Sequence, residues 1–99
     1  MILNEKFYIL KQIICIGGGG FGRNPKQRII EKYILLQSNA ETPNVLFIPT
    51  ASAEDKSYIV NFYSCFTGLN CNPNHINLFE RTPRLEGVVN KADIIYVGG

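Results

Sequence analysis

The chain has 99 residues, of which 45% are hydrophobic and 18% charged, a composition typical of one folded domain rather than of a disordered segment. Its net charge is only +2, and its lysines and arginines are scattered along the sequence. The one local excess, at Arg23, Lys26 and Arg28, lacks the interleaved aromatic residues of a nucleic-acid platform, so we expect no nucleic-acid partner.

The first half of the sequence alternates strand and helix patterns. The apolar run at 12–16 ends in four glycines and has no polar alternation, which predicts a strand buried on both faces. Asn24-Pro25 favours a helix start, because Asn caps helices and Pro suits the first turn. That helix should end near Ser38-Asn39, and its apolar positions have helical spacing: Ile29, Ile30, Tyr33, Ile34 and Leu36.

The second half continues the alternation. A buried strand is expected at Asn44–Ile48, stopped by Pro49, and a helix from residue 54 or 55 to 69. A turn at 71–74, a weaker strand at 75–79 and a short helix at 85–90 follow. The last strand is expected at Ile94–Val97, with Asp93 at its start. The apolar face of the long helix is expected to consist of Tyr58, Ile59, Phe62, Tyr63 and Phe66.

Strands that alternate with helices predict βαβ units and a parallel sheet with right-handed crossovers. We expect residues 12–99 to form the N-terminal part of one α/β domain, and residues 1–11 to be an extension or an extra strand. The strand at Ile94–Val97 is the most apolar, and such a strand belongs near the middle of a sheet. Its place at the end of the chain predicts that further sheet follows it or that another copy pairs with it.

The three cysteines are odd in number and lack the spacing of a disulfide framework or a zinc site. We therefore expect reduced thiols at Cys15, Cys65 and Cys71 in a cytoplasmic protein, with Cys15 in the core and no metal. Apolar runs of about five residues are too short to span a bilayer, and no signal peptide is recognised, so no membrane partner is expected.

The glycine-rich loop admits two interpretations. Gly17, Gly19 and Gly22 match a G-x-G-x-x-G fingerprint after a strand, which indicates a nucleotide or dinucleotide module. However, the helix cap comes later, and no acid follows the second strand to hold a ribose. A flexible loop beside an active site, in which Gly18 and Gly19 contact a substrate, is the preferred interpretation.

Thr50 and Ser52 follow the second strand, where ligands of parallel sheets bind, so both are candidate substrate-binding residues. Capping of the next helix is the more ordinary role for Ser52. His75 is the only histidine, and its position after a turn makes a catalytic role a minor alternative. Gly98 and Gly99 follow a buried strand directly, which is typical either of a turn or of backbone amides aimed at an oxyanion.

Three segments together resemble the dipeptidase E and cyanophycinase family of serine peptidases, and in particular its bacterial peptidase E-like branch. They are Ile13-Ile14-Cys15-Ile16-Gly17-Gly18-Gly19, Val45-Leu46-Phe47-Ile48-Pro49-Thr50-Ala51-Ser52 and Ile94-Ile95-Tyr96-Val97-Gly98-Gly99. The resemblance implies a three-layer α/β/α sandwich similar to class I glutamine amidotransferase domains, of the flavodoxin-like kind and incomplete in this chain. It also implies peptidase activity on small or acidic peptides and no cofactor.

In this family the last segment continues as Gly-Gly-Gly-Asn-Thr, so the resemblance implies that the amides of Gly98 and Gly99 belong to an oxyanion hole. The nucleophilic serine lies further on, in a Gly-x-Ser-Ala-Gly elbow, and the catalytic histidine follows it. Neither His75 nor Ser52, Ser57 or Ser64 matches those residues. The resemblance therefore implies that these 99 residues alone are an inactive fragment, and a non-catalytic interaction unit is the remaining alternative.

Overall fold

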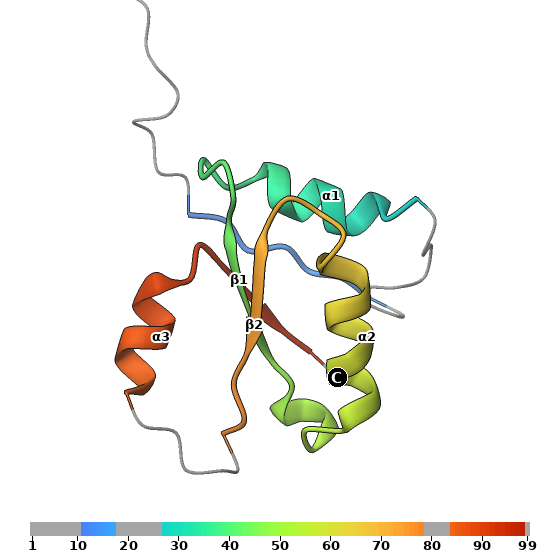
Figure 1. Ribbon diagram of the computed structural model, residues 1–99, viewed down its shortest axis with the longest axis vertical. Helices are drawn as coiled ribbons and strands as arrows, with labels where there is room; N and C mark the ends of the chain where they lie inside the picture. The colour runs from blue at the N-terminus through green and yellow to red at the C-terminus, as the bar shows by residue number, and fades with distance from the viewer. Residues whose placement is uncertain (1–10, 18–26, 79–83, 99) are drawn as a thin grey trace, which may run out of the picture.

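The computed structural model describes residues 11–17, 27–78 and 84–98. In chain order the elements are α1 (Ile29–Leu36), β1 (Asn44–Ile48), the 3-10 helix η2 (Thr50–Ser52), α2 (Lys56–Phe66), β2 (Asn72–His75), α3 (Leu85–Lys91) and β3 (Ile94–Val97). Figure 1 shows α1 and α2 on one side of the strands and α3 on the other. The predicted α/β class with a parallel sheet is confirmed.

The sheet has three strands in the order β2-β1-β3, and both neighbours of β1 run parallel to it. Because β1 has a partner on each edge and helices on each face, it is the most buried strand: Val45 is 1%, Leu46 2% and Phe47 0% exposed. The predicted bounds of β1 and β3 match the structure. β3, however, lies at an edge of this sheet, with Ile95 45% and Val97 68% exposed.

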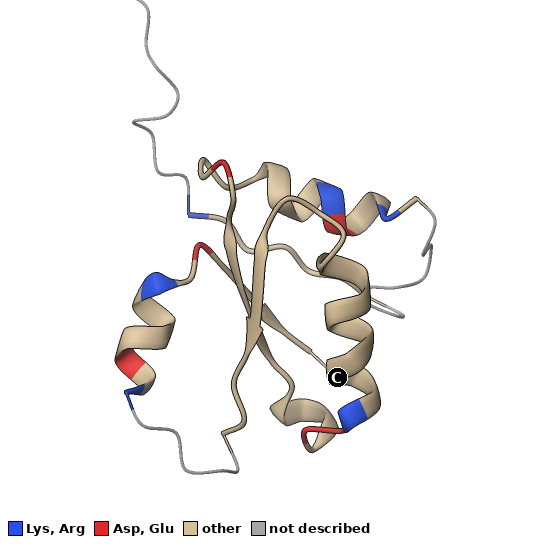
Figure 2. Ribbon diagram, in the orientation of Figure 1, with Lys and Arg blue, Asp and Glu red and all other residues tan. Residues whose placement is uncertain are grey.

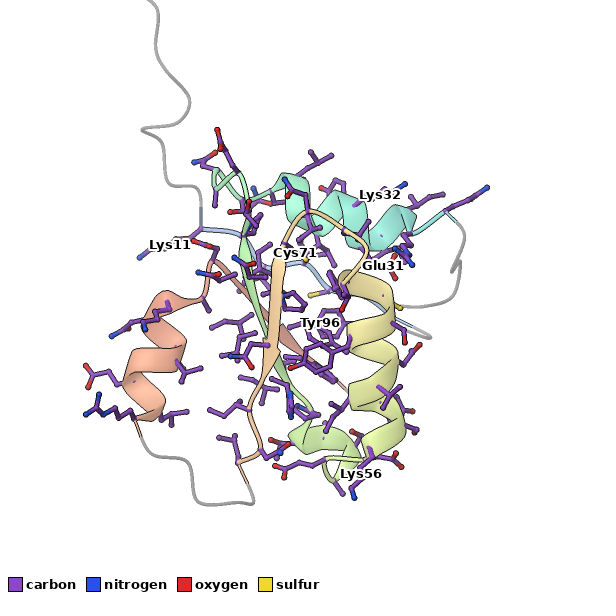
Figure 3. All side chains as sticks on the ribbon, in the orientation of Figure 1. Lys11, Glu31, Lys32, Lys56, Cys71 and Tyr96 are labelled. Carbon is purple, nitrogen blue, oxygen red and sulfur yellow. The ribbon has the colours of Figure 1, made fainter. Side chains whose placement is uncertain are left out.

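The main core lies between the sheet and α2 and is largely aromatic. The Phe47 ring stacks on Phe62 with centroids 4.8 Å apart, and Tyr96 meets Phe47 edge-on at 5.8 Å. Figure 3 shows Tyr96 between the strands and α2. Phe66 packs against Phe62 at 5.1 Å, and Leu35 of α1 joins the same cluster. The predicted apolar face of α2 is therefore confirmed, except at Tyr58 near the start of the helix, which is 43% exposed.

The sequence-based prediction of a strand at 12–16 is wrong for this structure. Residues 11–17 form no strand, Ile13 is 93% exposed, and Cys15 is exposed rather than in the core. The physical reason is that a strand exists only through its pairing. The edge of β1 that faces away from β2 is already paired with β3, so this position beside β1 is filled.

The third strand was also misplaced. The segment 71–74 was expected to be a turn and 75–79 a strand, yet β2 is Asn72–His75. Its sequence has no strand propensity, and it pairs because the Asn72 amide donates to the Pro43 carbonyl at 2.8 Å and the register continues to Phe47–His75. Pro73 is tolerated because β2 is an edge strand, where one missing donor leaves no buried acceptor.

The observed bounds of α2 and α3 lie close to those predicted from the sequence. α2 begins after Asp55 as expected and ends at Phe66, three residues short of the predicted end. α3 matches within one residue. α1 begins at Ile29, after Arg28 in a left-handed conformation with φ 51°, while Asn24-Pro25 lies outside the described residues. No helix in the described ranges is both long and apolar enough to cross a membrane.

We expect Phe62→Ala to lower the free energy of unfolding by about 3–5 kcal/mol, because Phe62 is fully buried and its ring contacts both the sheet and the next turn of α2. Urea unfolding measures this loss. Phe62→Leu leaves a smaller cavity and provides a measurable loss if the alanine variant does not fold.

The matched control is Val60→Ala on the same helix, since Val60 is 63% exposed. Its change should stay within about 0.5 kcal/mol. A Phe62→Ala loss as small as that of the control would show that the aromatic core does not hold α2 to the sheet.

Candidate functional site at the carboxyl edge of the sheet

All three strands are parallel, so their carboxyl ends meet at one edge of the sheet. β1 is followed there by Pro49 and Thr50, β3 by Gly98, and β2 ends at His75. Ligands of open parallel sheets bind outside this edge. The structure therefore brings two of the predicted site regions, Thr50–Ser52 and Gly98, to the same edge.

Position 98 favours glycine because the Tyr96 ring lies close to its backbone. A Cβ at this position would stand 2.9 Å from Cε1 of the Tyr96 ring. Its amide donates to the Ile48 carbonyl with the nitrogen and oxygen 3.5 Å apart, beyond the usual 2.7–3.2 Å of such bonds. An oxyanion donor must point at the ligand instead. The oxyanion role of Gly98 stays a prediction, and Gly99 lies outside the described residues.

The loop after β1 is tightly wound around one carbonyl. The Pro49 oxygen accepts from the Ser52 amide at 3.1 Å, the Ser52 hydroxyl at 2.9 Å and the Glu54 amide at 3.1 Å. Ala53 and Glu54 both lie in the left-handed region, with φ 55° and 58°. Left-handed backbone is costly for residues other than glycine, and such strain often accumulates beside functional sites.

The hydroxyl of Thr50 lies in this loop and is buried without a hydrogen-bond partner. An unpaired buried hydroxyl costs about 1–3 kcal/mol, so its burial beside the strand end is unfavourable for the chain alone. This fits the prediction that Thr50 contacts a substrate. The hydroxyl of Ser52 faces its own loop, because it donates to Pro49.

The expectation that Ser52 caps α2 is wrong, because Asp55 has that role. The Asp55 carboxylate accepts from the Ser57 amide at 2.7 Å and from the Ser57 hydroxyl at 2.6 Å. Both bonds favour the charged form and lower the pKa of Asp55 below its ordinary value of 3.8. The sequence held a signal for this cap, since Asp is among the preferred N-cap residues and Asp55 directly precedes the predicted helix.

His75 is paired with a tyrosine rather than with a nucleophile. Its Nδ1 lies 2.6 Å from the Tyr63 hydroxyl of α2, and the two rings meet edge-on at 5.4 Å. Burial raises the pKa of Tyr63 above 10.0, so the phenol stays protonated at neutral pH. This pair joins β2 to α2, and sequence analysis did not find it, because the two residues meet only when strand and helix pack.

Cys65 and Cys71 are poor nucleophiles because the structure buries their thiols wholly or in part. Burial is the main cause that raises the pKa of Cys65 and of Cys71 above 9.0, and Glu31 adds to the rise at Cys65. Figure 3 labels Glu31 on α1 and Cys71 after α2, both on the side of the strands where α1 and α2 lie. Because the thiolate is the reactive form, neither residue supports thiol catalysis at neutral pH.

The opposite, amino edge of the sheet is held by a polar network. The Asn44 amide donates to Asp93 Oδ2 at 2.8 Å, and the Asp93 amide donates to the Asn44 carbonyl at 2.9 Å. The Asn72 side chain donates to the Asn44 side-chain oxygen at 3.2 Å, so three strands are tied together. Asp93 was predicted at the start of the last strand, and the structure places it there, directly before β3.

Charged side chains of the described residues lie on helices and loops, and Figure 2 shows the three strands without any. Within residues 11–17, 27–78 and 84–98, no three His, Cys, Asp or Glu side chains are grouped as a metal site requires. Of the G-x-G-x-x-G positions only Gly17 is described, so the nucleotide alternative stays a prediction. Gly18 and Gly19 likewise lie outside the described residues.

The parallel sheet with its carboxyl-edge loops defines an α/β protein of the kind expected from the sequence. Residues 13–99 match the model of Peptidase family S51, and the chain belongs to this family. It is also 45% identical over 91 residues to a protein of Bacillus subtilis (strain 168) described as "Uncharacterized peptidase YgaJ". That alignment covers 91% of this chain and 40% of the relative, so the chain spans well under half of the relative's length. No solved structure gives a significant match.

We expect Asp55→Ala to lower the melting midpoint at pH 7 by several degrees, because the variant leaves the Ser57 amide without its cap. Asp55→Asn should lose less, since its side-chain oxygen still accepts a hydrogen bond. Thermal unfolding followed by circular dichroism measures both changes.

The difference between the natural chain and Asp55→Ala should depend on pH with a defined sign. The folded pKa of Asp55 is depressed, so its contribution is present above the unfolded value and disappears as pH falls through the folded value, below 3.8. A difference that stays constant down to pH 2 would contradict the assignment of the charged cap.

Proposed function

We propose that this chain is the N-terminal part of a serine-type peptidase that hydrolyses small or acidic peptides in the cytoplasm. Membership of Peptidase family S51 carries the proposal, and the meeting of Gly98 and Thr50 at the carboxyl edge supports it. The free thiols at Cys15, Cys65 and Cys71 suit a reducing compartment.

In the proposed reaction, a serine attacks the peptide carbonyl and a histidine accepts the proton of that serine. Both residues would be supplied by polypeptide beyond residue 99. The amides of Gly98 and Gly99 stabilise the oxyanion that forms. Thr50 and Ser52, with Gly18 and Gly19, contact the substrate beside the strand ends. For Gly98 to act, its amide must exchange the Ile48 carbonyl for the oxyanion, and the long 3.5 Å bond makes that exchange inexpensive.

A chimera tests this proposal. Residues 13–99 replace the matching stretch of the Bacillus subtilis relative, and hydrolysis of short peptides with acidic residues is measured together with labelling by a serine-directed fluorophosphonate. We expect hydrolysis by the chimera and none by the 99-residue chain alone. Gly98→Val in the chimera should lower kcat by about 10²–10³ with a smaller change in KM, because the oxyanion exists only in the transition state.

Gly87→Ala is the matched control, since a Cβ there meets nothing within 4 Å. It should leave kcat unchanged. Serine-dependent hydrolysis by the 99-residue chain alone would contradict the fragment proposal. Equal kcat for Gly98→Val and the control would remove Gly98 from the catalytic machinery.

A second candidate is an interaction unit that pairs β3 with another copy of the chain. The exposure of Ile95 and Val97 on this edge strand favours it, because an unpaired apolar edge is a template for further strands. Two copies related by a two-fold axis would place apolar side chains opposite one another along the joined edges.

Sedimentation equilibrium tests the second candidate. We expect the 99-residue chain to dimerise with rising concentration, and Val97→Lys to shift it to the monomer without loss of helix content. Val60→Lys, on the far side of α2 and similarly exposed, is the control and should leave the dimer unchanged. A monomer at all concentrations would exclude pairing through β3.

A further inference from the structure

We propose that the edge loop, residues Pro49 to Asp55, is closed under strain and opens to present the Thr50 hydroxyl to the peptide group of a substrate. Two features of the described loop support this role. One is a buried hydroxyl without a hydrogen-bond partner, and the other is a pair of consecutive left-handed residues. The role rests on the proposed function, because the group that binds is the peptide of a substrate.

The Thr50 hydroxyl is turned into the protein, although the residue lies at the surface. Thr50 as a whole is half-buried, but its Oγ1 atom is buried and has no hydrogen-bond partner. The nearby Ser52 hydroxyl differs, since it donates to the Pro49 carbonyl at 2.9 Å. A buried polar group without a partner destabilises the state that buries it. The closed loop is therefore unfavourable at Thr50 Oγ1, and a substrate reaches this atom only after the loop moves.

The backbone of the same loop is strained at Ala53 and Glu54. Their φ angles are 55° and 58°, and neither residue is a glycine. Left-handed backbone brings the Cβ of such residues close to the following carbonyl oxygen, so they adopt it only where the surrounding structure enforces it. Two such residues in succession raise the free energy of the closed loop relative to an open form in which both have ordinary φ angles.

Hydrogen bonds hold the edge loop closed, and both of its ends are anchored. The Pro49 carbonyl accepts from the Ser52 and Glu54 amides, each at 3.1 Å. Pro49 is fully buried after β1, and Asp55 caps α2. Between these anchors no residue is fully buried, so few apolar contacts oppose opening. Opening therefore breaks hydrogen bonds of the loop without unfolding β1 or α2.

A released threonine hydroxyl suits a peptide group. It can both donate and accept hydrogen bonds, and a peptide offers a carbonyl acceptor and an N–H donor. Thr50 follows β1 at the carboxyl edge, where ligands of parallel sheets bind. A peptide that binds only the open form has an apparent affinity reduced by the fraction of molecules that are open. Strain in the closed loop raises this fraction and therefore favours binding.

The first test compares two alanine-to-glycine substitutions in the edge loop of the 99-residue chain. Ala53→Gly removes the strain of a left-handed residue, so it stabilises the closed loop. We expect native-state hydrogen exchange of the Ser52 and Glu54 amides to slow about fivefold or more. Ala51→Gly is the matched control, because Ala51 is exposed and has no positive φ angle. It should not slow the exchange of these amides.

The second test removes the hydroxyl. Thr50→Val keeps the shape of the side chain and deletes the unpaired oxygen, so the melting midpoint should rise by several degrees. Ser52→Ala is the comparison, because it deletes a hydroxyl that has a partner, and the midpoint should fall. A midpoint that falls for both variants would show that the folded chain satisfies the Thr50 hydroxyl, and it would overturn the proposal.

The third test links the loop to the substrate in the chimera with the Bacillus subtilis relative. Ala53→Gly should raise KM by the factor by which it slows exchange, with kcat unchanged, because both KM and exchange depend on the open fraction. If the chimera does not hydrolyse the peptide, the Kd of the same peptide is measured by calorimetry and should rise by that factor. Ala51→Gly should raise neither constant.

Two further results would overturn the proposal. One is exchange of the Ser52 and Glu54 amides no faster than that of the Phe62 amide, which would show that the loop opens only when the whole chain unfolds. The other is an unchanged KM or Kd in an Ala53→Gly variant whose exchange is slowed. Because exchange, melting and peptide binding require no hydrolysis, an inactive chimera would count against the proposed peptidase function alone.

Discussion

The stack of Phe47 on Phe62 is the contact on which the rest of the structure depends. Phe47 is the fourth residue of the central strand, and its ring centroid lies 4.8 Å from that of Phe62 in α2 and 5.8 Å from that of Tyr96 in β3. The fully buried Phe47 ring therefore sets the distance from α2 to the sheet and the position of β3 beside β1. Thr50 and Gly98 at the carboxyl edge lie three residues beyond Phe47 and two beyond Tyr96, so the geometry of this edge follows from the same packing.

The parts of the fold that the sequence predicted are those whose signal is local. β1 and β3 are apolar runs ended by Pro49 and Gly98, and their bounds were correct. The carboxyl-edge position of Gly98 followed from the parallel order alone. β2 was misplaced because its residues have no strand propensity, and they form a strand only by pairing with β1. The Tyr63–His75 bond was missed for a related reason, since it requires the helix and strand to be packed first.

The failure at 12–16 has a different cause. Its apolar run, like that of β3, is suited to burial on both faces. One edge of β1 cannot accept two strands at once, so local propensity cannot decide which of them pairs. The strained loop at Ala53 and Glu54 and the long Gly98–Ile48 bond both lie at the carboxyl edge of the sheet.

Pro73 gives the sheet a direction of growth. It lies in the middle of β2, on the edge opposite β3, and it has no amide hydrogen to offer to an added strand. Addition of strands is therefore confined to the β3 side. A molecule with one competent edge can close a pair with another copy, but it cannot pass the contact on to a third. The same proline thus opposes open-ended, fibre-like assembly through the β2 edge of the described sheet.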